Sequence, residues 1–208
     1  MVNEVIMFTY GDASKPATWS NVPYCFCKAL ENKGILIHKI NINQEKLSPI
    51  WWRIISRVIV FFYPDSKWQY IRTRHFQNNT YKKIEQAIHR YPETDWCIFL
   101  SFDFYNKFSG IKSLVFGDWT YKTLIEERLN RKLYYFERYF ERVQKNVITS
   151  ADKVVCMFPR AAESMRKDYN RADVLHFGCN VVNNLYESPL VEILDTSPFE
   201  RSAFLSSS

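Results

Sequence analysis

Three short segments of the sequence combine polar and aromatic residues in a way that suits ligand binding. In the first, residues 10–16, Gly11 would let a ligand approach the backbone closely, and Lys15 would add positive charge. Because the amino end of a helix favours phosphate, this segment is a candidate phosphate-binding loop. It matches neither the GxGxxG nor the Walker A pattern, so a plain connection between a strand and a helix is the alternative.

The second segment, residues 116–121, places a carboxylate beside aromatic rings. The Asp118 carboxylate could accept hydrogen bonds from hydroxyl groups, and Trp119 or Tyr121 could stack on a sugar or a base. The alternative is that Asp118 only caps the helix that follows, as aspartate often does. The two roles are compatible, and the position after an apolar run makes Asp118 a candidate functional residue.

The third segment, residues 176–180, contains a histidine and a cysteine. His176 and Cys179 are three positions apart, but no further ligand lies nearby at a suitable spacing. The four histidines of the chain are scattered, and no Ser-His-Asp, HExxH or paired-carboxylate pattern is present. We therefore expect no metal site.

The composition indicates one folded domain. Of the 208 residues, 47% are hydrophobic and 17% aromatic, which excludes a disordered chain, and only five are glycine, which excludes a collagen-like one. The five cysteines form no CxxC pair, which fits reduced thiols in the cytosol. The net charge of +6 is compatible with binding to a polyanion, a nucleotide or an anionic membrane surface, and it does not distinguish among these partners. The first residues lack the basic pattern of a signal peptide.

Apolar runs alternate with helical patterns, which predicts an α/β fold with a mainly parallel sheet flanked by helices in three layers. Strands are predicted over residues 5–9, 35–40, 96–100, 114–116, 153–158 and 173–176. Helices are predicted over residues 20–32, 50–62, 68–89, with a break at Asn78 and Asn79, 123–146 and 159–167. Because parallel strands end at the same edge of a sheet, we expect Gly11, Asp118 and Gly178 to meet there.

Residues 50–62 form the longest apolar stretch, interrupted by Arg53, Ser56 and Arg57. Ser48 and Pro49 before it suit the cap and first position of a helix. A helix that is apolar on nearly all sides is usually buried, which favours packing in the core. Tryptophan and arginine beside an aliphatic stripe also suit a helix at a membrane surface, so contact with a membrane or a lipid acceptor is the alternative.

The order of these motifs resembles that of a known enzyme family. The first strand and glycine loop are followed by VFGDWTY (residues 115–121), SADKVVCMFPRAAESMRKDY (residues 150–169) and VLHFGCN (residues 174–180). This is similar to the N-terminal half of a family-4 retaining glycosyltransferase of the GT-B fold. The similarity covers residues 4–183, and its most specific part begins at residue 150.

The resemblance implies a domain layout and a set of site residues. It implies a Rossmann-like domain over residues 1–183, with a helical insertion at residues 46–90 on the acceptor side, and a linker or tail over residues 184–208. In this family the reaction takes place in the cleft between an acceptor-binding and a donor-binding domain. The resemblance implies a catalytic role for Asp118 and a donor-phosphate loop that contains Gly11, Asp12 and Lys15. The acceptor-binding residues that it implies are Trp19, Trp119, Thr120, Tyr121 and Arg160. It also implies a cleft loop that contains His176, Gly178 and Asn180.

The function implied is the acceptor-binding half of an enzyme that transfers a sugar from a nucleotide-sugar donor to a glycan or lipid-linked acceptor with retention. The paired glutamates of the family's donor-binding domain have no counterpart in these 208 residues. The expected partner is therefore a C-terminal donor-binding domain, and the chain alone is expected to be inactive. The nucleotide sugar is a substrate, and no cofactor is expected in this chain. The expected location is the cytoplasm, with peripheral contact at the inner face of the membrane as one possibility.

Two other functions are compatible with parts of the sequence. A basic, aromatic-rich module that binds nucleic acid or an anionic surface is the main alternative. Because no RRM, KH or zinc-finger signature is present, a nucleic-acid partner is not expected. A free-standing nucleotide-binding enzyme has the least support, because the sequence has no GxGxxG motif and no defensible catalytic pair.

Overall fold

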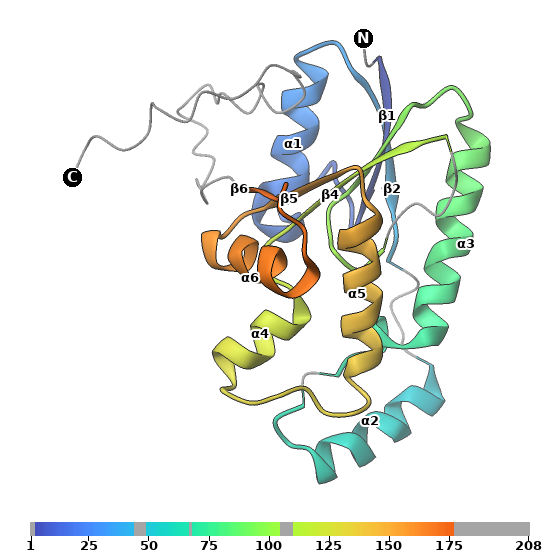
Figure 1. Ribbon diagram of the computed structural model, residues 1–208. Coiled ribbons are helices and arrows are strands. Elements are labelled where there is room, and N and C mark those ends of the chain that lie inside the picture. Colours follow the sequence, from blue (N-terminus) through green and yellow to red (C-terminus); the bar gives the residue numbers. More distant parts are fainter. Residues whose placement is uncertain (1–2, 44–48, 67, 105–109, 177–208) are drawn as a thin grey trace.

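The computed structural model describes residues 3–43, 49–66, 68–104 and 110–176, and it is an α/β domain built on a six-stranded parallel sheet (Figure 1). The strand order is β2-β1-β3-β4-β5-β6. The strands are β1 (Glu4–Thr9), β2 (Leu36–Asn41), β3 (Trp96–Phe99), β4 (Lys112–Gly117), β5 (Lys153–Cys156) and β6 (Leu175–His176). The predicted fold class, a three-layer Rossmann-like domain with a parallel sheet, is confirmed.

Helices cover both faces of the sheet and its carboxyl edge. On one face lies α1 (Val22–Glu31), preceded by the short 3-10 helix η1 (Thr18–Asn21). The opposite face carries α3 (Arg74–Arg90), α5 (Arg138–Ser150) and α6 (Pro159–Tyr169). Two further helices lie beyond the carboxyl edge of the sheet in Figure 1, namely α2 (Ile50–Phe62) and α4 (Tyr121–Arg128).

The core consists of two layers because side chains alternate along each strand. In β1, Val5 and Met7 pack on the α1 side, whereas Ile6 and Phe8 pack on the α3 and α5 side. All four are buried. The Phe8 ring stacks on Phe99 of the neighbouring strand, with centroids 4.9 Å apart. A strand buried on both faces has a continuous apolar run in its sequence, which is why β1 and β3 could be predicted from the sequence.

The strand order reverses at β1, and this reversal sets where a ligand can bind. β1 pairs in parallel with β2 on one side and with β3 on the other. The connections that follow β1 and β3 therefore diverge and leave a crevice outside the carboxyl ends of these strands. Open α/β sheets bind their ligands at such a position.

The periodicity over residues 123–146 predicts one long helix, but this prediction is wrong. The structure has two helices in this part of the chain, α4 and α5. In the connection between them, Asn130 has a left-handed backbone with φ of 47°. Because asparagine is one of the few residues that tolerate this conformation, it is a common point at which a helix ends.

The break predicted at Asn78 and Asn79 is also wrong, because α3 runs through both residues. The chain is interrupted earlier, by the 3-10 helix η2 (Tyr70–Arg72). Thr73 then caps α3, because its hydroxyl accepts a hydrogen bond from the Phe76 backbone N–H at 3.2 Å.

The bounds predicted for the helix over residues 50–62 are confirmed, but its predicted burial in the core is wrong. Trp52 is the one residue of α2 that is buried. Pro49 occupies the cap position of the helix, and Ser48 lies outside the described residues. Within the described part of the chain, no helix is both long enough and apolar enough to cross a membrane.

Candidate functional site at the carboxyl edge of the sheet

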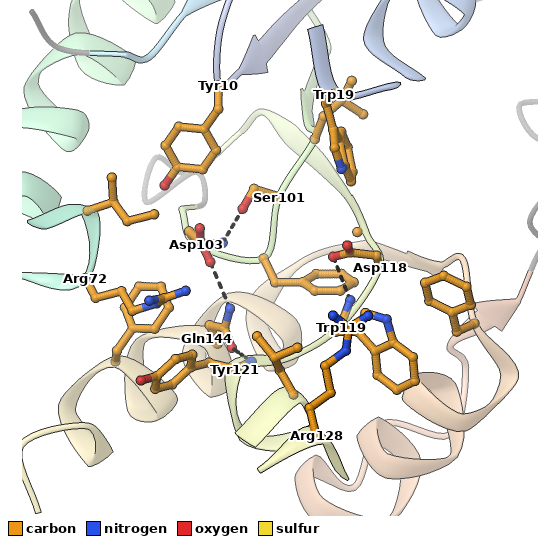
Figure 2. A pocket seen from close by; sticks show the side chains of 17 residues that line it. Tyr10, Trp19, Arg72, Ser101, Asp103, Asp118, Trp119, Tyr121, Arg128 and Gln144 are labelled. Atoms are coloured by element: carbon orange, nitrogen blue, oxygen red, sulfur yellow. Dashed lines mark hydrogen bonds between the residues drawn. The ribbon is translucent and has the colours of Figure 1, made fainter. Parts of the chain in front are cut away.

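A cavity of about 450 Å³ lies where β1, β3 and β4 end (Figure 2). Its walls are formed by the residues that follow these strands, together with residues from η2, α4 and α5. The segments after β1 and β4, which are far apart in the sequence, are therefore brought to one edge, as predicted. Residues Gly178 and Asn180 of the third segment lie outside the described residues, and His176 is exposed at the end of β6 and does not line the cavity.

Asp118 lines the cavity directly after β4. Its Oδ1 atom accepts a hydrogen bond from the Trp119 backbone N–H at 2.7 Å. The residue that caps α4 is Thr120, whose hydroxyl accepts from the Thr123 backbone N–H at 3.2 Å. The interpretation of Asp118 as a helix cap is therefore wrong, and its side chain faces the cavity instead of the helix terminus.

Two indole rings, Trp19 and Trp119, supply apolar surface in the cavity wall. Trp119 stacks on Phe158 with ring centroids 4.9 Å apart, and Trp19 packs edge-on against Phe116. Both tryptophans are only partly buried. Indole rings that line a cavity and are partly exposed suit stacking on a planar or sugar ring.

Gly117 at the end of β4 allows Phe102 to lie against the strand. A Cβ atom at residue 117 would lie 2.6 Å from the Phe102 ring. This is closer than carbon atoms pack, so only glycine leaves room for the ring in its present position. Phe102 and Gly117 both line the cavity, and their contact helps to set its shape.

A polar group that sequence reasoning missed lies in the segment after β3. Asp103 points into the cavity region, and its Oδ1 atom accepts a hydrogen bond from Gln144 Nε2 at 2.8 Å (Figure 2). Its backbone N–H donates to Ser101 Oγ at 3.1 Å. The other end of the Gln144 amide, Oε1, accepts from the Tyr121 backbone N–H at 2.6 Å. Gln144 thus ties the loop after β3 to both α4 and α5.

The protonation of Asp103 is shifted by its surroundings. Burial raises the pKa of Asp103 above the ordinary value of 3.8, although the hydrogen bond from Gln144 and the positive charge of Arg72 oppose the rise. The Tyr10 hydroxyl points towards Asp103 in Figure 2. Burial, and then the Asp103 charge, raise the pKa of Tyr10. An acid with a raised pKa in a cleft, beside a tyrosine hydroxyl, is a candidate functional group.

Two arginines give the cavity positive charge. The Arg72 guanidinium lies over the Tyr121 ring, 4.4 Å from its centroid. Arg128, at the end of α4, is exposed and also lines the cavity. In Figure 2 its side chain extends towards Trp119 and Asp118. These cations could bind an anionic group of a ligand at the mouth of the cavity.

Tyr121 connects the cavity to a buried ion pair. Its ring lines the cavity, and its hydroxyl donates to Glu137 Oε1 at 2.8 Å. Two guanidinium nitrogens of Arg131 donate to the two carboxylate oxygens of Glu137 at 2.8 and 2.9 Å. Burial raises the pKa of Glu137, but the hydrogen bonds from Arg131, the Tyr134 backbone N–H and Tyr121 outweigh it and leave that pKa below 4.5.

The predicted donor-phosphate loop lies after β1, but Gly11, Asp12 and Lys15 do not line the cavity. Gly11 has φ of 97°, and its N–H donates to Asn41 Oδ1 at 3.0 Å. The Ser14 N–H donates to Asp12 at 2.9 Å, and Lys15 forms an ion pair with Asp12 at 3.6 Å. These groups therefore satisfy one another, and their role towards phosphate stays a prediction.

Two residues predicted to bind the acceptor also lie away from the cavity lining. Thr120 is buried as the cap of α4. Arg160 is on the surface, where its Nε atom pairs with Glu127 at 2.9 Å. Of the predicted acceptor-binding residues, the structure thus brings Trp19, Trp119 and Tyr121 into the cavity wall and places Thr120 and Arg160 outside it.

Comparisons with known proteins assign no family to this chain. The sequence matches no protein-family model and no curated protein. Within the described residues, nowhere do three His, Cys, Asp or Glu side chains gather in a way that could hold a metal ion. The glycosyltransferase resemblance therefore stays a prediction, and the fold and the cavity are the observations from which a function can be argued.

Proposed function

We propose that this domain binds the acceptor of a glycosyltransferase, which transfers a sugar with retention from a nucleotide-sugar donor to a glycan or lipid-linked acceptor. The observation that carries the proposal is the cavity outside the carboxyl ends of β1, β3 and β4, which is lined by both aromatic rings and carboxylates. Its volume of about 450 Å³ falls within the range of ligand sites, roughly 300 to 1,000 Å³.

The residues in the cavity suit a carbohydrate. A sugar has an apolar face that stacks on an aromatic ring, and Trp19 and Trp119 offer such rings. It also has hydroxyl groups that donate hydrogen bonds, and the carboxylates of Asp103 and Asp118 accept them. A cavity with both kinds of group is typical of a site that orients a polyhydroxylated ligand.

The charges in the cavity suit transfer of a sugar as well as binding. Glycosyl transfer passes through a positively charged, oxocarbenium-like state, which a carboxylate such as Asp118 would stabilise. The leaving diphosphate of the donor is negatively charged, and Arg128 at the mouth of the cavity would attract it. In this proposal the remaining contacts to the donor come from a C-terminal domain, and this chain alone does not turn over.

The proposal is tested by titrating the 208-residue chain with maltose, cellobiose and lactose while following tryptophan fluorescence. We expect at least one disaccharide to bind, and we expect Asp118→Asn and Trp119→Ala to weaken its binding about tenfold or more, since each removes a direct contact. Trp96→Phe is the matched control, because Trp96 lies at the opposite end of β3 from the cavity. Its sugar affinity should equal that of the wild-type chain.

Two results would count against the proposal. One is that no sugar binds, either in this titration or on a broad array of immobilised glycans. The other is that a single-stranded oligonucleotide binds with an affinity that falls steeply with salt, as phosphate contacts require, while sugars do not compete. The second result would favour a nucleic-acid-binding module instead.

A further inference from the structure

Among the helices that the structure describes, α2 carries the largest group of exposed apolar side chains. Ile50, Ile54, Val58 and Phe61 are 76%, 60%, 52% and 81% exposed. They are spaced by four, four and three positions, so they form one continuous row along the helix. A soluble surface helix normally turns such a row towards the core.

The opposite side of α2 holds the helix against the domain, so the exposed row is not the result of a detached helix. Trp52 is buried, and Ser56 and Ile59 on the same side are partly buried. The Trp52 ring lies 6.1 Å from that of Tyr70 in η2. Between this side and the exposed row, Trp51 packs edge-on against His75 at the start of α3. These contacts fix which face of α2 points outward.

The segment after α2 is fixed as well. The Asp65 carbonyl accepts a hydrogen bond from Arg131 at 3.1 Å, and the Ser66 hydroxyl donates to Glu137 at 3.3 Å. The buried ion pair between Arg131 and Glu137 therefore anchors the carboxyl end of α2 to the connection between α4 and α5. Figure 1 shows α2 at the end of the molecule that lies beyond the carboxyl edge of the sheet.

Positive charge borders the apolar row on one side. Arg53 and Arg57 are exposed and lie one helical turn apart, next to the row. Residues 49–63 contain no acidic residue, and neither arginine has an ion pair with any residue that the structure describes. Trp51 and Phe62, which are 41% and 68% exposed, border the row on the other side.

We propose that α2 docks this domain onto an anionic lipid surface, with the helix lying in the plane of the membrane. The row of Ile50, Ile54, Val58 and Phe61 enters the boundary between headgroups and acyl chains, and the two arginines contact lipid phosphates. Aromatic rings at the border, such as Trp51, suit the headgroup level. The 13-residue helix lies on the surface and does not cross it.

Charge favours a membrane over a second copy of the chain. Two α2 helices that packed together through their apolar rows would bring four arginines to one contact without an acidic partner on either helix. An anionic membrane supplies the missing negative charge at the depth where the arginines lie. Docking would also bring the cavity near the membrane, because η2 follows α2 and contributes Ile71 and Arg72 to the cavity wall. The docking proposal itself does not depend on the proposed function.

Flotation of the full chain with lipid vesicles tests the proposal. We expect binding to vesicles of mixed phosphatidylglycerol and phosphatidylcholine, weaker binding at high salt, and little binding to pure phosphatidylcholine. The variant Ile54→Ser/Phe61→Ser should reduce partitioning about tenfold or more, since it removes two large apolar side chains from the lipid contact. Arg53→Gln/Arg57→Gln should reduce binding to anionic vesicles and remove much of its salt dependence.

Matched control variants distinguish docking through α2 from a general change in surface hydrophobicity or net charge. Leu36→Ser removes an exposed apolar side chain on β2, and Lys145→Gln/Lys153→Gln removes two exposed charges from α5 and β5. Both control variants should bind anionic vesicles as the wild-type chain does. Circular dichroism should show that all variants are folded, because every substituted side chain is exposed.

Three results would overturn the proposal. The first is that the wild-type chain binds no vesicles. The second is that the α2 variants bind as well as the controls. The third is that the chain forms a dimer by analytical ultracentrifugation, which Ile54→Ser/Phe61→Ser abolishes, while vesicle binding is absent; the partner of α2 would then be a second copy. Sugar binding in the cavity is measured in a separate experiment. The vesicle results therefore test membrane docking alone, and the sugar titration tests the proposed function alone.

Discussion

The Gln144 side chain donates a hydrogen bond to Asp103 at 2.8 Å, although the two residues are 41 positions apart in the sequence. Gln144 also accepts from the Tyr121 backbone N–H, so both ends of its amide are used. One buried side chain on α5 thus fixes the loop after β3 and the start of α4, which together form much of the cavity wall.

Replacement of this glutamine should destabilise the fold. Gln144→Ala would leave both the Asp103 carboxyl and the Tyr121 N–H without their present partner in a buried place. Each unsatisfied buried group costs about 1–3 kcal/mol, so we expect the free energy of unfolding to fall by about 2 kcal/mol or more. Urea denaturation measures it. Gln86→Ala, at an exposed position of α3, is the control and should change stability by less than about 0.5 kcal/mol.

Asp103 should make stability decrease as the pH rises. Burial raises the pKa of Asp103 in the folded state above 3.8, so protonation of this carboxyl favours the folded state. The protonated carboxyl makes its full contribution to stability below the pKa of Asp103 in the unfolded chain. This contribution is lost as the pH rises through the folded-state pKa. Asp103→Asn cannot ionise, so its stability relative to wild type should increase over that window, by at most about 1.4 kcal/mol per pH unit. Urea denaturation at a series of pH values measures the difference, and a constant difference would contradict the raised pKa.

Glu137 should have the opposite pH dependence. Its folded-state pKa lies below 4.5, so the ionised carboxylate favours the fold above that value, and the contribution is lost as the pH falls through the folded-state pKa. At neutral pH, Glu137→Gln would leave the Arg131 guanidinium, whose side chain is only 15% exposed, without its counter-charge. We expect a loss of about 3–5 kcal/mol, measured by thermal or urea denaturation.

The control for this prediction is an ion pair on the surface. Glu127 pairs with Arg160, whose side chain is 70% exposed. Glu127→Gln should therefore cost less than about 1 kcal/mol, because solvent screens an exposed pair. Equal losses for Glu127→Gln and Glu137→Gln would show that burial does not strengthen the Glu137 pair.

The central strands β1, β3, β4 and β5 and the convergence of their ends could be predicted because buried parallel strands produce continuous apolar runs. The same reasoning located Asp118 and Trp119, which follow β4 directly. Asp103 lies in the segment LSFDF (residues 100–104) that follows β3. A charged residue between two phenylalanines was the one feature of the sequence that could have indicated a site there. Its partners Arg72 and Gln144 come from distant helices, and only the packing of those helices brings them to the cavity.

The exposure of α2 could not be predicted from its sequence. Apolar spacing shows that residues 50–62 form a helix, but a helix that is apolar on most sides has no single face to turn inward. Which side is buried depends on where Tyr70 holds the helix and where the pair of Arg131 and Glu137 holds the segment that follows it. Helix periodicity likewise continued across Asn130, because a single residue with a left-handed backbone leaves little trace in the apolar pattern.

Gly117 offers a test of how closely the cavity wall is packed. In Gly117→Ala the new methyl group would meet the Phe102 ring at 2.6 Å, so the ring or the strand must shift. We expect a loss of about 1–3 kcal/mol in the free energy of unfolding, the usual cost of overpacking a core. Weaker sugar binding should accompany it, because both residues line the cavity.

A second substitution distinguishes this clash from a general intolerance of alanine in β4. Phe102→Leu removes the ring atoms that the methyl group would meet, so Gly117→Ala should cost less in the Phe102→Leu background than in the wild-type chain. Denaturation of the four proteins of this cycle gives the coupling between the two positions, which should lie at about 0.5–3 kcal/mol in favour of the double variant. If the losses in the free energy of unfolding of the two single variants simply add in the double variant, the alanine disturbs the strand itself. The requirement for glycine at the edge of the cavity would then have a cause other than the close contact with Phe102.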